Sequence, residues 1–173
     1  MDDQKAASSV EKKDGETKPT FSIVFLGDKS SNKTKIVELY QRDKNHASIA
    51  GGEYMRKDIL SNSGKCSFRI WDLPSDDRFT SFVPIYCRNA HAIIITVNAN
   101  IEGQQESLQK WLDFLNNNGI ISKESLIIIA ATYSINEKLV EVDKLSNFAL
   151  NHKFDLFKIS VEFLEHMDDI FDF

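Results

Sequence analysis

A glycine, a lysine and a threonine stand at the spacing of a phosphate-binding loop. The pattern of such loops is G-x-x-x-x-G-K-[ST], and the chain matches it at every fixed position except the second glycine. The matching stretch is Gly27, Asp28, Lys29, Ser30, Ser31, Asn32, Lys33 and Thr34. Backbone N–H groups of the loop and the positive end of the following helix would bind phosphate oxygens. The pattern predicts that Lys33 reaches the outer phosphates and that the Thr34 hydroxyl binds Mg²⁺.

Asn32 takes the place of the second glycine. Glycine is favoured at that position because a phosphate approaches the backbone closely there. Asparagine is one of the few other residues that tolerate unusual backbone angles, so we expect the loop to be altered but not lost. A serine-rich loop in front of a helix is the alternative interpretation.

The elements around this loop follow from hydrophobic spacing. We expect a strand over residues 20–26, a helix over 33–42 and a polar loop over 43–53. Two β segments, 54–60 and 65–71, flank a turn-forming stretch and predict a hairpin. Cys66, Phe68 and Ile70 alternate with polar residues and should share one face of the second segment.

The rest of the chain alternates between helices and strands. A Pro-containing loop and a short helix run to about 88, and further helices are expected at 104–117, at 141–151 and after 163. Apolar runs predict strands at 92–97, 126–131 and 154–159. We expect a three-layer, doubly wound α/β fold with a mostly parallel six-stranded sheet and one antiparallel edge strand. Residues 1–19 are expected to be a disordered tail, and residues 20–173 one domain.

Composition excludes several classes of function. The chain has 173 residues and a net charge of −5, which argues against nucleic acid as a partner. It has two cysteines and four histidines without metal-ligand spacing, which fits a reduced cytoplasmic setting. No apolar run is long enough for a membrane span, and the chain has no cysteine near its C-terminus. We therefore expect no direct lipid anchor.

A phosphate-type loop followed by a hairpin that ends in Trp71-Asp72 resembles the Ras superfamily of small GTP-binding proteins. The resemblance covers about residues 20–172 and is strongest with the Rab branch. The run from Trp71 to Phe79 is similar to W-D-T-A-G-Q-E-R-F, and the run from Tyr86 to Ala90 is similar to Y-Y-R-G-A. Trp111 stands where Rabs usually carry a tryptophan, and the run from Arg78 to Tyr86 is most similar to that of Golgi-trafficking Rabs.

Two motifs on the phosphate side depart from the family. The D-x-x-G motif reads Asp72-Leu73-Pro74-Ser75, so Asp72 survives while the glycine is lost. The resemblance implies Thr34, Ser48 and Asp72 as the Mg²⁺ ligands. The glutamine that orients the attacking water is Asp76, which cannot donate a hydrogen bond when ionised. We expect lost or very slow hydrolysis and assign no catalytic residue.

The guanine-reading motifs are also changed. The family's N-K-x-D would align with Thr132, Tyr133, Ser134 and Ile135, and its S-A-K with Ser160, Val161 and Glu162. Thr132, Tyr133, Ile135, Ser160 and Val161 are therefore the candidate base-binding positions. Losing the aspartate removes two charge-assisted hydrogen bonds, a cost of about 3 kcal/mol or ~100-fold in affinity. The acidic residues from Glu162 onwards are expected to be a solvated helix face.

Three aromatic residues keep the character that Rabs use to bind effectors. Tyr54, Trp71 and Tyr86 fall on the two switches and the hairpin between them. Each aromatic side chain could instead simply pack against the core. Together they favour a retained effector face.

The resemblance therefore implies a Rab-like interaction module of vesicle traffic, with impaired guanine recognition and hydrolysis. Its cofactor, where one binds, would be Mg²⁺ with GTP or GDP. Its partners would be protein effectors or trafficking regulators, which would recruit a cytoplasmic protein to Golgi or vesicle membranes. A genuine GTP-binding GTPase with slow hydrolysis is the alternative, and a P-loop protein that uses ATP is a third reading.

Overall fold

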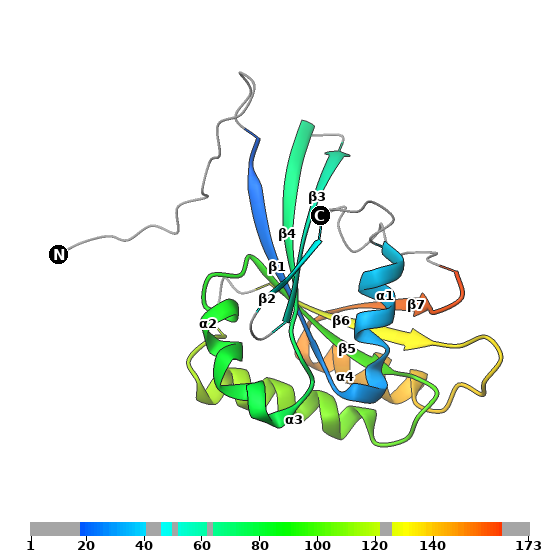
Figure 1. Cartoon of the computed structure of the whole chain (residues 1–173). Coiled ribbons are helices and arrows are strands. Elements are labelled where there is room, and N and C mark those ends of the chain that lie inside the picture. Colours follow the sequence, from blue (N-terminus) through cyan, green and yellow to red (C-terminus); the bar gives the residue numbers. More distant parts are fainter. Residues whose placement is uncertain (1–17, 41–45, 50–51, 62–63, 122–125, 164–173) are drawn as a thin grey trace.

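The structure is a computed structural model that describes residues 18–40, 46–49, 52–61, 64–121 and 126–163. A sheet of seven strands runs through its centre in the order β2-β3-β4-β1-β5-β6-β7 (Figure 1). The strands are β1 (Thr20–Gly27), β2 (His46–Ile49), β3 (Gly52–Ser61), β4 (Gly64–Asp72), β5 (Ala92–Asn98), β6 (Leu126–Tyr133) and β7 (Asp155–Ser160). Five of them, β4, β1, β5, β6 and β7, are parallel, while β3 and β2 are added antiparallel. The predicted α/β class is confirmed.

The helices lie on both faces of this sheet and confirm the predicted three layers (Figure 1). The helical elements are η1 (Lys29–Ser31), α1 (Lys33–Tyr40), η2 (Asp77–Phe82), α2 (Val83–Cys87), α3 (Gln104–Asn117) and α4 (Val142–His152). Residues 164–173, where a closing helix was predicted, lie outside the described part of the chain. No helix of the described residues is long and apolar enough to cross a membrane.

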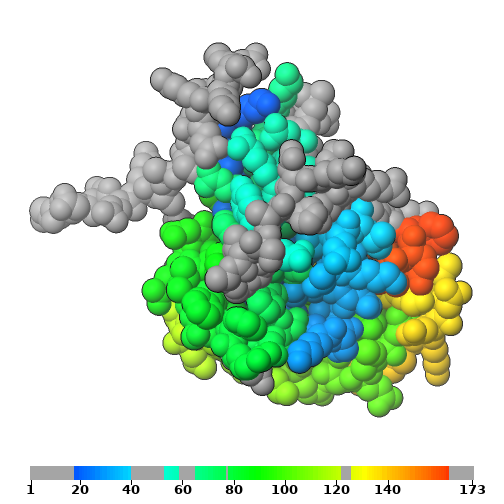
Figure 2. Space-filling view, viewed as in Figure 1, coloured from blue at the N-terminus to red at the C-terminus, as the bar shows by residue number. Residues whose placement is uncertain are grey.

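Alternating side chains of the strands supply two separate cores. Val24 and Leu26 of β1 face the larger core, which they share with Leu108 of α3 and Leu145 of α4. The residues between them face the other way, where Phe25 packs with Ile36 and Val37 of α1 and Ile70 of β4. β5 is buried along its whole length because both of its faces are covered by helices. In the space-filling view, the light-blue surface of α1 lies between the green η2–α2 segment and the orange-red β7 (Figure 2).

The predicted strand count is one too low. The stretch 43–53 was expected to be a loop, but it contains β2 and the first residues of β3. β2 pairs antiparallel with β3, so the predicted edge strand β3 is not at the edge. The four residues of β2 are of mixed polarity and too few to show the alternation of polar and apolar residues that marks a strand. The segment becomes a strand because the neighbouring backbone of β3 supplies its hydrogen bonds.

The hairpin prediction is confirmed and extends further than expected. Pairing between β3 and β4 runs from Glu53 opposite Asp72 to Ser61 opposite Gly64. Residues 1–17 of the predicted tail lie outside the described residues. The last two residues of that tail contact the hairpin, because Ser67 donates its N–H to the Pro19 carbonyl at 2.9 Å and Lys18 pairs with Asp58 at 3.2 Å.

Candidate nucleotide-binding site

The phosphate-type loop joins the carboxyl end of β1 to the start of α1. After Gly27 the chain makes the 3₁₀ turn η1, and Asn32 then takes a left-handed conformation with φ 58° and ψ 15°. Lys33 is the first residue of α1. The side chain at position 32 therefore tolerates the backbone angles that the family obtains with glycine. Its amide also donates to the Thr132 hydroxyl at 3.4 Å.

Gly27 is required by packing against β5. A Cβ at this position would lie 2.3 Å from Thr96 Oγ1 and 2.7 Å from Ser31 Oγ. The Thr96 hydroxyl donates to the carbonyl of Leu26 at 2.7 Å and contacts the Ser31 hydroxyl at 3.1 Å. Only glycine leaves room for this buried hydroxyl pair.

Contacts from distant elements hold the rest of the loop. The Asp28 carboxylate accepts from the Ser107 hydroxyl at 2.5 Å and from the Trp111 indole N–H at 3.0 Å. Asn98 donates to the Ser30 carbonyl at 3.0 Å, and Thr132 donates to the Ser31 carbonyl at 2.8 Å. Side chains from α3, β5 and β6 therefore hold the loop in place through hydrogen bonds. The sequence analysis did not predict that Trp111 binds the phosphate-type loop. Its indole N–H, a hydrogen-bond donor, was the signal that could have suggested a carboxylate partner such as Asp28.

Lys33 and Asp72 form a buried ion pair beneath the loop. Lys33 is 4% exposed and Asp72 5%. The Lys33 ammonium contacts Asp72 Oδ1 and also donates to the Leu73 carbonyl at 2.5 Å. The other carboxylate oxygen, Asp72 Oδ2, accepts from the Thr34 hydroxyl at 2.8 Å. The predicted phosphate ligand and two of the predicted metal ligands thus bind one another.

These residues fit Mg²⁺ in type, because a hydroxyl and a carboxylate are the hard oxygen ligands that Mg²⁺ prefers. A bound Mg²⁺ would neutralise the phosphate charge, as it does in phosphoryl transfer. The Lys33 ammonium, however, already contacts the Asp72 carboxylate. The third predicted ligand, Ser48, lies in β2 opposite Glu53, and its side chain is outside the described part of the structure.

Asp76, at the position predicted to have lost its water-orienting role, is bound by Arg78. Its carboxylate accepts from Arg78 through the backbone N–H, Nε and Nη2, each at 3.0 Å, and so forms the N-cap of η2. Lys29 of the loop lies 3.7 Å from it. The Arg78 side chain, its backbone N–H and the nearby Lys29 keep the pKa of Asp76 well below its usual range. The carboxylate is therefore ionised and accepts hydrogen bonds only.

The predicted base-binding positions serve mainly structural roles. The Thr132 hydroxyl bonds to the carbonyls of Ser31 and Val97, and Val161 is 5% exposed and donates its N–H to the Tyr133 carbonyl at 2.9 Å. The Ile135 side chain is 56% exposed, so it contributes neither to the core nor a hydrogen bond.

Glu162 links the loop after β6 to the loop after β7, which together contain the predicted base-binding positions. Its carboxylate accepts from the Ser134 hydroxyl at 2.6 Å, from the Ile135 N–H at 3.2 Å and from the Ser160 hydroxyl at 3.0 Å. The bond from Ser134 is the main reason that the pKa of Glu162 is lowered. Glu162 is exposed, as expected, but it lies in a bend rather than on a helix face. Its carboxylate is bound by Ser160, two positions before it, and by the distant loop of Ser134 and Ile135.

The three predicted effector aromatics form one continuous row. The ring centroids of Tyr54 and Trp71 are 4.7 Å apart, and those of Trp71 and Tyr86 are 5.0 Å apart. The three side chains come from β3, β4 and α2, and each is half-buried. The structure brings together residues that are separated by 17 and 15 positions, although packing and partner binding are both compatible with this row.

A mostly parallel sheet with a phosphate-type loop after its first strand, and a Lys-Thr pair at the start of the next helix, defines a P-loop nucleotide-binding fold. The family described as "Ras of Complex, Roc, domain of DAPkinase" matches residues 22–134. The chain belongs to this Ras-like family and is Rab-like among the small GTPases.

Rab and Ypt proteins are among its relatives. GTP-binding protein YPT52 of Saccharomyces cerevisiae is 29% identical over 119 residues, which cover 62% of this chain and 50% of that protein. Ras-like GTP-binding protein RYL2 of Yarrowia lipolytica is 31% identical over 64% of this chain and 53% of its own length. Ras-related protein Rab-1D of Dictyostelium discoideum is 20% identical over 87% and 76%. The chain thus spans about half the length of the first two relatives.

Proposed function

We propose that this protein is a Rab-like interaction module of vesicle and membrane traffic, in which guanine recognition and GTP hydrolysis are impaired. The observation that carries the proposal is the buried ion pair of Lys33 with Asp72, whose carboxylate also accepts from the Thr34 hydroxyl. In an active family member these groups would serve a phosphate and a metal ion. Here a ligand must first compete with a buried ion pair, whose partners are costly to separate.

The base side and the hydrolytic position support the same proposal. Ile135 cannot accept a hydrogen bond from guanine, and the nearest carboxylate, Glu162, already accepts three. Asp76 is bound to Arg78 and cannot donate a hydrogen bond to a water molecule. Weak nucleotide binding and negligible turnover follow from these contacts.

The aromatic row supports a role in binding proteins. Tyr54, Trp71 and Tyr86 are half-buried rather than fully enclosed, and aromatic side chains of this kind are enriched where one protein binds another. Its partners would be effectors or regulators of trafficking. Through them the protein would be recruited from the cytoplasm to Golgi or vesicle membranes.

A second candidate is a genuine GTP-binding protein with Mg²⁺ and slow hydrolysis. The left-handed Asn32 favours it, because the loop keeps a turn that ends directly at α1. The two candidates differ in nucleotide content. Purified protein should be denatured, and the released nucleotide separated by chromatography: less than one mole in ten moles of protein supports the interaction module, whereas stoichiometric GDP or GTP supports the alternative.

A further inference from the structure

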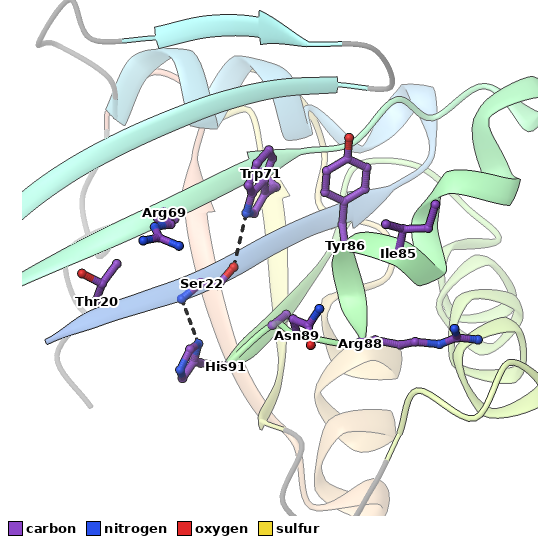
Figure 3. Close-up of a pocket in the computed structure, with 10 residues that line it drawn as sticks. Thr20, Ser22, Arg69, Trp71, Ile85, Tyr86, Arg88, Asn89 and His91 are labelled. Carbon is purple, nitrogen blue, oxygen red and sulfur yellow. Dashed lines mark hydrogen bonds between the residues drawn. The ribbon is translucent and has the colours of Figure 1, made fainter. Parts of the chain in front are cut away.

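A pocket of about 410 Å³ lies beside the aromatic row, on the face of the sheet next to α2 (Figure 3). Its floor is the first part of β1 and the last part of β4, and its wall is the end of α2 with the turn that follows. The residues used below are Ser22, Arg69, Trp71, Ile85, Arg88 and His91. Its volume is within the usual range of ~300–1,000 Å³ for ligand pockets.

The pocket is an extension of the larger core. Ser22 is opposite Arg69 in the pairing of β1 with β4, and Val24 is opposite Trp71. Side chains two residues apart on a strand share a face, so Ser22 lies on the same face as Val24 of the core. Polar side chains replace apolar ones where the face passes beyond α2. Along β1 and β4, this face of the sheet therefore changes from an apolar core surface to the polar surface of the pocket.

Hydrogen bonds fix the floor of the pocket. The Trp71 indole N–H donates to the Ser22 hydroxyl at 3.2 Å, and the Ser22 backbone N–H donates to His91 Nδ1 at 2.9 Å (Figure 3). Because Nδ1 accepts, the neutral imidazole carries its proton on Nε2 and is a donor there. The Trp71 ring is also held between Tyr54 and Tyr86. The pocket is thus preformed, which lowers the entropic cost of binding.

The charge of the pocket is opposite to that of the chain. The net charge is −5, yet the ionisable side chains that line the pocket are Arg69, Arg88, Tyr86 and His91, with no carboxylate among its lining residues. Figure 3 shows Arg69 and Arg88 on opposite sides of the pocket. The Trp71 and Tyr86 rings and Ile85, which is 62% exposed, also line the pocket. A ligand that suits this arrangement carries negative charge next to an apolar group.

We propose that this pocket binds an acidic peptide segment of a protein partner, in which an aromatic or aliphatic side chain lies a few residues from carboxylates. The apolar side chain would pack against Ile85 and the Trp71–Tyr86 rings, while the carboxylates bind Arg88 and Arg69. Charge-assisted hydrogen bonds of guanidinium with carboxylate supply both strength and direction. The inference rests on the proposed interaction function and specifies the chemistry of the partner.

The test is a selection from a phage-displayed library of random dodecapeptides on the full chain. We expect enriched peptides with Asp or Glu within four positions of Phe, Trp, Tyr or Leu. Synthetic versions should bind the wild type in fluorescence polarisation and weaken with added salt. Arg88→Glu and Ile85→Asp should each reduce affinity at least 10-fold. Both side chains are exposed, so both variants should fold, and Lys110→Glu on α3 is the matched charge control.

Several outcomes would overturn this assignment. Peptides that are neutral or basic, the absence of any enriched peptide, or equal binding to Arg88→Glu and Lys110→Glu would each do so. A dimer of this chain that dissociates on Ile85→Asp would identify a second copy as the occupant instead.

Tyr54→Ala separates this inference from the proposed function, because Tyr54 contacts Trp71 without lining the pocket. Peptides lost on Tyr54→Ala but retained on Arg88→Glu would support the effector face and refute the pocket. Peptides retained on both would refute both.

Discussion

The Lys33 ammonium forms a buried ion pair with the Asp72 carboxylate, although the two residues are 39 positions apart in the chain. The pair joins the first turn of α1 to the end of β4. The same two side chains would be needed separately by a phosphate and a metal ion. We therefore expect this one contact to affect both the stability of the protein and its affinity for nucleotide.

Lys33→Met should destabilise the nucleotide-free protein. It would leave the Asp72 carboxylate buried without a cation, and breaking a buried pair in this way costs about 3–5 kcal/mol. Urea unfolding followed by circular dichroism measures the loss. Lys35→Met, at an exposed position of the same helix, is the control and should change the free energy of unfolding by less than about 0.5 kcal/mol. Equal stability of the two variants would show that the ion pair contributes nothing.

Nucleotide binding should be weak and should discriminate little between GTP and ATP. Guanine finds no carboxylate at Ile135, and the phosphates must compete with Asp72 for Lys33. Loss of two charge-assisted hydrogen bonds alone weakens binding by about 3 kcal/mol, or ~100-fold. Calorimetric titration with Mg²⁺ and each nucleotide tests this. A nanomolar dissociation constant for GTP would contradict the prediction, and so would a strong preference for GTP over ATP.

Hydrolysis by the wild type should be undetectable or very slow. Asp76 is ionised and bound to Arg78 through both of its oxygens. The double substitution Asp76→Gln with Ser75→Gly restores a water-orienting amide and the glycine of the family motif. Phosphate release under single-turnover conditions should be faster in this variant. A wild type that turns over as fast as the variant would show that these two positions do not limit the reaction.

Glu141 should make stability depend on pH. Burial of this carboxylate raises its pKa. The hydrogen bonds from Lys144 and from the backbone N–H groups of Gly103, Gln105 and Gln104 together lower the pKa by more than burial raises it, so that it lies below its ordinary value of 4.5. A carboxylate whose pKa is lower in the folded than in the unfolded state stabilises the protein at pH values above the unfolded-state pKa. This stabilisation is lost as the pH falls through the folded-state pKa.

Glu141→Gln should therefore cost about 1–3 kcal/mol near neutral pH, because it weakens the cap of α3. The gap between variant and wild type should close as pH falls below the ordinary value of 4.5. Thermal melts across this range measure the gap, with Glu137→Gln, at an exposed loop position, as the control. A gap that stays constant down to pH ~3 would mean that Glu141 does not titrate with folding.

Local spacing in the sequence predicted most of the fold. The apolar run of β5 indicates a strand buried on both faces. The i, i+3, i+4, i+7 spacing indicates one buried face of α3, formed by Leu108, Trp111, Leu112 and Leu115, and this helix has the predicted bounds. The loop from Gly27 to Thr34 could be recognised because its pattern fixes four positions within eight consecutive residues, and the chain keeps three of them. β2 could not be predicted, because a short edge strand depends on the partner that pairs with it.

By itself, the sequence determined the order of the elements and the place of the phosphate-type loop, because these are properties of residue type and local period. It also predicted the loss of the guanine-reading and water-orienting side chains. Only the tertiary structure decided how the surviving polar groups are used. Lys33 with Asp72, Asp28 with Trp111 and Glu162 with Ser134 are pairs separated by 39, 83 and 28 positions. A buried or converging polar group binds whichever partner the fold brings within hydrogen-bonding distance, and no local pattern encodes that choice.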